Sequence, residues 1–250
     1  MEELLNEWCK ELLKYQKDDA GDDLKPVDVE RSVAYAKDLL QGLIKLRSFQ
    51  QGVSVFGSAR LGENSKYYRS ARELGGLLAQ YGHSIVTGGG YGIMAAASRG
   101  AHEYGGRVLG LNIELPHEQT LNPYTTDNLE FRYFFARKVM LTMAAKVYVF
   151  YPGGFGTMDE FFDILVLMQT GKMPKMPMFL MGKTFWKPLE KFITTRMEAN
   201  NLVAKGDRTI YKITDNVMDV VKAAEKLGHH KIDENIYDSM RLKKQPAVNE

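Results

Sequence analysis

The amino-acid sequence predicts an α/β protein in which a parallel sheet has helices on both faces and a helical segment precedes the sheet. Short runs of β-branched and aromatic residues alternate along the chain with segments whose apolar residues recur at helical spacing. Two of the short runs end in glycine-rich turns that lead directly into a helical segment. Strands that alternate with helices pair in parallel, and such a sheet is covered on both faces.

The composition is that of an ordinary globular protein. The chain has 250 residues, of which 44% are apolar and 26% are charged, so it can bury a full core. Its net charge of +2 argues against a nucleic-acid binder, and its single cysteine, Cys9, excludes an internal disulfide and a cysteine-based metal site. The acidic N-terminus lacks a signal-peptide core, and no segment approaches the roughly 20 apolar residues of a membrane span. We therefore expect a soluble cytoplasmic protein without membrane or nucleic-acid partners.

Residues 1–50 are predicted to form a helical N-terminal extension. Residues 1–15 form a short helix, a polar loop follows at residues 17–23, and a second helix runs to about Phe49. The second helix has apolar residues at helical spacing, namely Val29, Val33, Ala36, Leu40 and Leu43. We expect no chemistry in this extension, which packs on the main body or on a partner chain.

The first part of the sheet is predicted to contain three strands, at residues 52–57, 83–87 and 106–112. An alanine-rich helix from Ile93 to about Tyr104 follows the second strand, and its small side chains allow it to lie close to a neighbour. The helix after the first strand is predicted to bury Ala71, Leu74, Leu78 and Tyr81.

The second part of the sheet follows a proline-bearing connection at residues 115–128. We predict a strand at residues 145–151, a glycine turn at 152–156, a helix at 157–169 and a strand at 178–181. A helix before this unit carries Val139, Met140 and Met143. The helix at 157–169 is predicted to bury Met158, Phe161, Phe162, Leu165 and Met168. Two final helices are predicted to bury Trp186, Leu189, Phe192 and Ile193 in the first, and Val217, Val220, Val221 and Ala224 in the second.

Both glycine turns, at residues 88–92 and 152–156, are candidate phosphate sites. Free N–H groups and the positive end of the dipole point the same way at a helix start, so an anion is favoured there. Because both turns follow strands of one parallel sheet, we expect them to face one crevice at its carboxyl edge. The alternative is that these glycines only permit tight turns and close packing of helix and strand.

The first turn also contains a G-x-G-x-x-A match that begins at Gly90, with Glu114 about 20 residues further on. This pattern is typical of a dinucleotide site in which the carboxylate binds a ribose. The match is weak, because it follows the second predicted strand and not the first. A nucleotide is therefore favoured as the ligand over intact NAD.

The helix after the second turn begins with two acidic side chains. Thr157 and Glu160 fit the S/T-x-x-E capping box, in which each satisfies one free N–H group at the helix start. Asp159 and Glu160 in the first turn would repel a bound phosphate. The favoured arrangement places the phosphate on the amides of residues 153–157 and directs Glu160 sideways toward sugar hydroxyls.

Arg137 and Lys138 form a basic pair near the predicted start of a helix, where cations oppose the dipole. The pair is either a solvated surface feature or an anion clamp, and the planar fork of arginine suits phosphate. The histidines show no metal-ligand spacing with the carboxylates and are expected on the surface or in loops; they are His83, His102, His117, His229 and His230. We predict no metal site.

Arg137-Lys138 together with Pro152-Gly-Gly-Phe-Gly-Thr-Met-Asp-Glu160 resembles the signature of the LOG family, P-G-G-x-G-T-x-x-E. The resemblance extends from about Val53 to Met181. Members of this family are cytokinin riboside 5′-monophosphate phosphoribohydrolases. The resemblance implies a Rossmann-like catalytic domain at residues 51–228, a homodimer, and no cofactor. The polar tail, residues 229–250, is expected to be mobile.

The resemblance also implies roles for individual residues. Arg137 and Glu160 match the catalytic pair of the family. The substrate-binding positions implied by the resemblance are Ser58, Gly89, Gly90, Met94, Glu118, Lys138, Gly153, Gly154, Phe155, Gly156 and Thr157. The implied reaction releases the free base and ribose 5-phosphate from a nucleoside 5′-monophosphate, such as AMP or a cytokinin ribotide.

Two alternatives remain at the sequence level. The first is a general purine or pyrimidine nucleotide hydrolase without a preference for cytokinins. The second is a non-catalytic carrier of a nucleotide or of a cofactor such as the molybdenum cofactor, whose carriers have a similar fold. The presence of both Arg137 and Glu160 favours an enzyme, because a carrier needs the glycine turn but no carboxylate beside the sugar.

Overall fold

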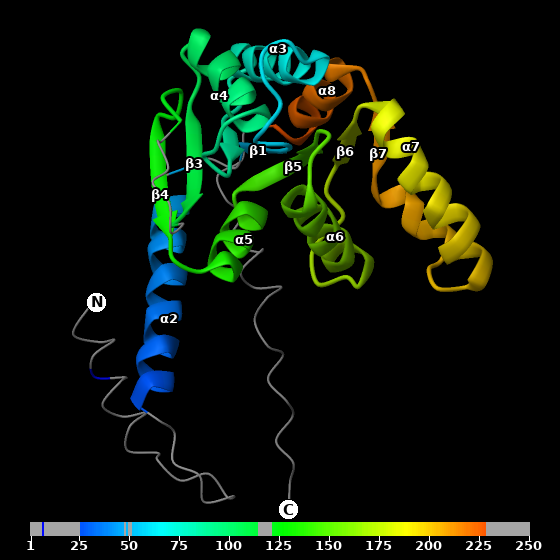
Figure 1. The fold of residues 1–250 in the computed structure, drawn as a ribbon. Helices are drawn as coiled ribbons and strands as arrows, with labels where there is room; N and C mark the ends of the chain where they lie inside the picture. Colours follow the sequence, from blue (N-terminus) through cyan, green and yellow to red (C-terminus); the bar gives the residue numbers. More distant parts are fainter. Residues whose placement is uncertain (1–6, 8–25, 48, 50–51, 115–121, 229–250) are drawn as a thin grey trace, which may run out of the picture.

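The computed structural model describes residue 7 and residues 26–47, 49, 52–114 and 122–228 (Figure 1). The predicted helix at residues 1–15 and the tail at 229–250 lie outside the described residues, except for Glu7. Glu118, His117, His229 and His230 also lie outside them. No helix among the residues described has the length and apolar character needed to cross a membrane.

A seven-stranded sheet in the order β4-β3-β2-β1-β5-β6-β7 forms the centre of the molecule. All six pairings between neighbouring strands are parallel, as predicted. The strands are β1 (Gly52–Phe56), β2 (Ile85–Thr87), β3 (Val108–Ile113), β4 (Asp127–Phe131), β5 (Ala145–Phe150), β6 (Met178–Met181) and β7 (Lys212–Thr214). β1, β2, β3 and β5 are buried along their whole length, which explains their nearly continuous apolar composition.

Helices cover both faces of this sheet, which confirms the predicted fold class (Figure 1). α3, α4 and α8 pack on one face, and α2, α5, α6 and α7 contribute to the core on the other face. The helices are α2 (Pro26–Arg47), α3 (Lys66–Gln80), α4 (Ile93–Glu103), α5 (Phe134–Met143), α6 (Phe155–Gln169), α7 (Lys183–Phe192) and α8 (Val217–Leu227). Short helical turns occupy Ile193–Met197, Glu198–Asn200 and Lys205–Ile210.

The strand order places a reversal point between β1 and β5. From β1 the chain adds β2, β3 and β4 on one side, and it then returns to add β5 on the other side of β1. In open parallel sheets, ligands bind beyond the carboxyl ends of the strands at such a point. The turns that follow β1 and β5 are therefore the segments best placed to form a binding site.

The two edge strands were not predicted. β4 occupies the end of the segment expected to be a connection, and β7 has three residues, Lys212–Thr214. In β4 the residues alternate between half-buried and exposed up to the buried Phe131. An edge strand is half solvated, so it carries polar residues and lacks the apolar run that identifies a central strand.

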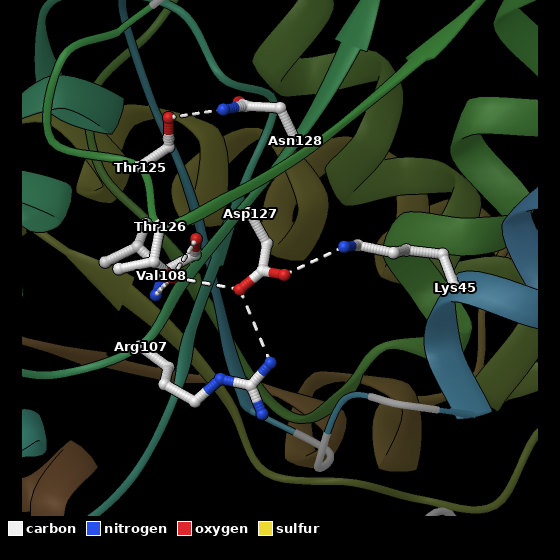
Figure 2. A network of polar contacts seen from close by, with 7 residues as sticks. All are labelled: Lys45, Arg107, Val108, Thr125, Thr126, Asp127 and Asn128. Atoms are coloured by element: carbon white, nitrogen blue, oxygen red, sulfur yellow. Dashed lines mark hydrogen bonds and ion pairs between the residues drawn. The ribbon is translucent and has the colours of Figure 1, made fainter.

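The long helix α2 packs on the main body. Leu46 is fully buried, and the Lys45 ammonium donates to the Asp127 carboxylate at the start of β4, with a distance of 2.8 Å (Figure 2). Arg107 contacts the second oxygen of the same carboxylate at 3.3 Å. The hydroxyl of Thr126 also donates to that oxygen. The last part of α2 is thereby fixed across the sheet edge.

Several aromatic side chains predicted to be buried are exposed. Tyr81 follows the end of α3 and is 43% exposed, because the helix stops before its ring returns to the buried face. Phe162 on α6 and Phe192 at the end of α7 are 37% and 54% exposed. The apolar residue next to each of them takes the core position, namely Phe161 on α6 and Ile193 at the start of the helical turn after α7.

The prediction for His83 is also wrong, because this side chain is buried. Its Nε2 lies 2.5 Å from a carboxylate oxygen of Glu225 on α8, and its Nδ1 lies 3.2 Å from the Lys146 ammonium at the start of β5. α8 supplies Glu225 from a distant part of the chain, so the local sequence around His83 carries no sign of its burial. His102 is exposed, as predicted.

Candidate functional site

The main chain of Ser58 joins the turns at the reversal point of the sheet. Its N–H group donates to the carbonyl of Pro152 after β5, with a distance of 3.0 Å. Its carbonyl accepts from the amide of Ile93 at the start of α4, also at 3.0 Å. These two bonds hold the three turns after β1, β2 and β5 around one point, as the expected common crevice requires.

The start of α6 differs from the predicted capping box. The helix begins at Phe155, with Gly154 as its N-cap, so Thr157 is the third helical residue and does not cap it. Asp159 and Glu160 are the fifth and sixth residues, and the first turn contains no acidic side chain. The predicted repulsion of a phosphate is therefore absent, because the helix starts two residues earlier than the apolar pattern indicates.

The glycines of this turn have different roles. A Cβ atom at Gly153 would lie 2.1 Å from the hydroxyl oxygen of Thr157, so the packing of Thr157 requires a glycine there. A Cβ atom at Gly154 or Gly156 would meet no other atom of the described residues within 4 Å. Phe155 between them is 96% exposed. The amides at the start of a helix have no intrahelical acceptor, so this open turn can present its N–H groups to an anion.

Arg137 of α5 and Glu160 of α6 form a buried pair beside this turn. Their nearest atoms, Nη2 and Oε1, are 3.9 Å apart, and the side chains are 17% and 6% exposed. The Nε of Arg137 and the Oε2 of Glu160 are buried, and neither has a hydrogen-bond partner among the described residues. Buried polar atoms are almost always satisfied in folded proteins, so two such atoms side by side are typical of a functional site.

Burial dominates the electrostatics of this pair. It raises the pKa of Glu160 to about 7, although the positive charges of Arg137 and Lys138 act in the opposite direction. Burial also lowers the pKa of Arg137, against the attraction of the Glu160 carboxylate. Each charged group thus loses solvation free energy on burial, and the attraction of its partner compensates for only part of this loss. Glu160 titrates near neutral pH as a result.

Lys138 points to a different partner. Its ammonium lies 2.9 Å from a carboxylate oxygen of Asp159, which is 60% exposed. The basic pair predicted as an anion clamp is therefore divided: Arg137 enters the buried site, and Lys138 joins α5 to α6 near the surface.

The turn at residues 88–92 lies next to Arg137, since a Cβ atom at Gly88 would be 3.6 Å from the Arg137 Nη1. Gly89 and Gly92 have φ angles of 71° and 64°. A Cβ atom at Gly89 would lie 1.7 Å from the Asn112 Oδ1, and one at Gly92 would lie 2.1 Å from the Ser58 carbonyl oxygen. Packing alone therefore requires both glycines. A Cβ atom at Gly90 would lie 2.7 Å from Cε, the end of the flexible Met94 side chain.

Two asparagines that support this turn were not identified from the sequence. The Asn112 side chain is buried beside Gly89 and donates to the Asn128 side chain at 3.2 Å. Asn122 is also buried, and its amide lies 3.4 Å from the Gly90 carbonyl oxygen. Asn112 lies within β3 and Asn122 lies before β4, and neither belongs to a sequence motif, so only the packing shows the role of these residues.

Glu114 does not join this site. It is exposed, its carboxylate lies 3.6 Å from Arg132, and it lines a polar cleft of about 380 Å³ between α2 and the ends of β3 and β4. None of the described residues that line this cleft belongs to a glycine turn. The arrangement provides no support for a ribose contact of the dinucleotide type.

Comparison with known proteins identifies the family. Residues 94–224 match the model of a family described as possible lysine decarboxylase. The chain belongs to this family, the LOG family. It is 29% identical over 150 residues to a rice (Oryza sativa subsp. japonica) protein named cytokinin riboside 5′-monophosphate phosphoribohydrolase LOG, in an alignment that covers 59% of this chain and 62% of the relative. A protein from Rhodococcoides fascians named cytokinin riboside 5′-monophosphate phosphoribohydrolase is 28% identical over 153 residues, in an alignment that covers 59% of this chain and 76% of that protein.

Solved structures of other proteins share the fold of this LOG family member. The structure of TM1055 has a TM-score of 0.52 and 26% identity, covering 70% of this chain and 99% of that one. A molybdenum cofactor carrier protein from Chlamydomonas reinhardtii has a TM-score of 0.51 and 23% identity, covering 71% of this chain and 98% of the carrier. The likeness to the carrier concerns the fold.

Proposed function

We propose that this protein hydrolyses the N-glycosidic bond of nucleoside 5′-monophosphates, AMP and cytokinin ribotides among them, to free base and ribose 5-phosphate. The observation that carries the proposal is the buried, incompletely bonded pair of Arg137 and Glu160 beside the open start of α6. Membership of the LOG family and the names of the relatives support it. Because the proposed substrate is a nucleotide, we also propose that the protein is located in the cytoplasm.

Glu160 is proposed to act on the ribose. When the C1′–N bond breaks, its electrons leave with the base and positive charge develops on the sugar, as in glycoside hydrolysis. An ionised Glu160 stabilises that charge, orients the water that attacks C1′, and can accept a proton from it. The departing base takes up a proton, so the reaction consumes one water molecule.

Arg137 and the α6 turn are proposed to bind the phosphate end of the substrate. The guanidinium lies between Glu160 and the turn at residues 88–92. It favours the ionised form of Glu160 and adds positive charge next to the amides of α6. Phosphate binding of this kind supplies energy far from the bond that breaks, so nucleosides should be much poorer substrates than their monophosphates.

Release of base from AMP and from isopentenyladenosine monophosphate, with adenosine as the control, tests this proposal. We expect release from the two monophosphates and at most about 1% of that rate from adenosine, because adenosine lacks the phosphate. The ratio of the two monophosphate rates measures the preference for cytokinin ribotides. If purified protein releases no base but binds AMP tightly in calorimetry, the hydrolase is wrong and a nucleotide carrier is favoured.

We also propose that the protein forms a homodimer through the outer face of α5 and α6. Lys138 and Asp159 join these two helices, which together expose five apolar side chains by 37–55%, namely Phe134, Phe135, Val139, Phe162 and Val166. An exposed apolar surface of this kind is typical of an interface between subunits.

Light scattering after size exclusion should report a dimer at micromolar concentration. Val166→Lys should give a monomer, whereas Leu202→Lys, on an equally apolar residue away from these helices, should not; a monomeric wild-type protein would exclude the dimer.

A further inference from the structure

The helix that carries Arg137 begins without a cap of its own. Tyr133 is the N-cap residue of α5, and its side chain makes no capping hydrogen bond. The first turn contains no acidic residue, and Arg137 and Lys138 follow as the fourth and fifth helical residues. Cations this close to a helix start oppose the helix dipole. The N-terminal end of α5, which carries Arg137, is therefore intrinsically unfavourable as a helix.

Asp38 of α2 caps the main chain immediately before α5 from a distant part of the chain. Its Oδ2 accepts hydrogen bonds from the amides of Arg132 and Tyr133, at 2.9 and 3.1 Å. The side chain is 7% exposed, and it lies 94 residues before Arg132 in the sequence. The carboxylate thus binds the amides of the N-cap residue and of the residue before it, and it places negative charge at the positive end of the helix dipole.

Further contacts hold α2 in place around this cap. Tyr35 packs edge-on against Tyr133 and Phe135, with ring centroids 4.4 and 4.9 Å apart. One turn beyond Asp38, a Cβ atom at Gly42 would lie 2.4 Å from the Met140 side chain, so α2 and α5 approach closely there. Lys45 then fixes the last part of α2 to Asp127 (Figure 2). Asp38 therefore projects from a helix that is anchored on both sides of it.

Tyr133, whose amide is bound by Asp38, is also a main-chain hydrogen-bond partner of Arg137. The Arg137 amide donates to the carbonyl of Tyr133 at 3.3 Å, and the Tyr133 amide is the one bound by Asp38. Asp38 and Arg137 are thus connected through a single residue. α2 lies outside the residues 94–224 that match the family.

We propose that Asp38 is a positioning residue that fixes the first turn of α5 and thereby holds Arg137 against Glu160. The catalytic consequence rests on the proposed function, whereas the structural consequence does not. The N-terminal helix is, in this view, part of the machinery that prepares the site.

Kinetics of three variants test the catalytic consequence. Asp38→Ala should lower kcat for AMP by about tenfold or more, since a 1 Å displacement of a catalytic group can cost more than this. Asp38→Asn keeps an oxygen that can accept from both amides and should restore most of the activity. Asp215→Ala is the matched control: it removes a carboxylate that accepts from the Lys183 amide at the start of α7, at 2.9 Å, and should leave kcat within about twofold of wild type.

The pH profile separates positioning from a general loss of stability. Arg137, Lys138, Asp159 and Asp163 are the charged groups that act on Glu160. If Arg137 moves away, the pKa of Glu160 rises further, so the midpoint of kcat/KM should shift to higher pH in Asp38→Ala and not in Asp215→Ala. Should Asp38→Ala not fold, Asp38→Glu, which displaces the carboxylate by one methylene, should show the same changes to a smaller extent. Wild-type kcat and midpoint in folded Asp38→Ala, or in Asp38→Glu where the alanine variant does not fold, would overturn the inference.

Hydrogen exchange tests the structural consequence without any substrate. In Asp38→Ala the amides from Tyr133 to Arg137 should exchange at least about tenfold faster, while those of α6 remain as in the wild type. Unchanged exchange at the start of α5 would overturn the positioning role whether or not the protein is a hydrolase. Faster exchange in a protein that releases no base would leave the positioning role standing and refute only the proposed function.

Discussion

Replacing Glu160 with glutamine is expected to lower the turnover of AMP by about 10²- to 10⁴-fold while AMP binding stays measurable. Glutamine keeps the shape of the side chain but cannot carry the negative charge that stabilises the developing positive charge on the ribose. The α6 amides that we propose to bind the phosphate are main-chain groups, so this substitution leaves them in place. Initial rates of base release and calorimetric titration with AMP measure the two effects separately.

Asp163→Asn provides the matched control for this variant. Asp163 lies on the same helix, and its replacement removes the same charge, but it interacts with Glu160 only at a distance. We expect turnover within about threefold of wild type, because loss of a neighbouring negative charge changes mainly the titration of Glu160. Equal turnover of Glu160→Gln and wild type would remove Glu160 from the reaction.

The titration of Glu160 predicts how activity depends on pH. Because the ionised carboxylate is the active form in the proposed mechanism, kcat/KM should rise with pH through a midpoint near 7, the value to which burial raises its pKa. This dependence should disappear in Glu160→Gln. A fall in kcat/KM above this pH would instead assign Glu160 the role of a general acid.

The same titration affects stability. The pKa of Glu160 rises from 4.5 in the unfolded chain to about 7 in the folded protein, so the folded state binds the proton more tightly. Protonation of Glu160 therefore adds to the free energy of unfolding, and this contribution is fully present below pH 4.5, the pKa in the unfolded chain. It is lost as pH rises through about 7, the pKa in the folded protein, and it amounts to roughly 3 kcal/mol in total. Glu160→Gln should therefore unfold at a higher temperature than wild type at pH 8, and the difference should shrink toward pH 5.

Gly154→Val is expected to weaken AMP binding by at least about tenfold without lowering thermal stability. The backbone of Gly154 is extended, a conformation that valine readily adopts, and its Cβ position meets no described atom within 4 Å. The β-branched side chain therefore fills the space in front of the free amides of α6 and excludes the phosphate. Calorimetric titration with AMP and a thermal melt measure the two effects.

Two controls make this result specific. Gly206→Val adds the same side chain at another open position, far along the chain in Lys205–Ile210, and should leave AMP binding unchanged. Adenosine has no phosphate, so its weaker affinity should be affected much less by Gly154→Val than that of AMP. If AMP binds to Gly154→Val as to wild type, the phosphate does not lie on this turn.

The central part of the fold could be predicted from local sequence patterns. β1 and β5 are buried on both faces, so they appear as apolar runs, and the glycines after β5 mark the turn before α6. The motif around Arg137 and Glu160 likewise identified the pair that the structure brings to within 4 Å. These features depend on residues close together in the chain or on a spacing that the family shares.

The sequence by itself therefore determined the parallel α/β sheet, the glycine turns that follow its strands, and Arg137 and Glu160 as neighbours. Only the tertiary structure decided the edge strands β4 and β7, the burial of His83 and the true start of α6. It also provided the cap on α5, because Asp38 reaches Tyr133 across 95 residues of sequence. Burial and capping of this kind depend on groups from elements that are distant in sequence. The local sequence pattern does not indicate which distant group will be the partner.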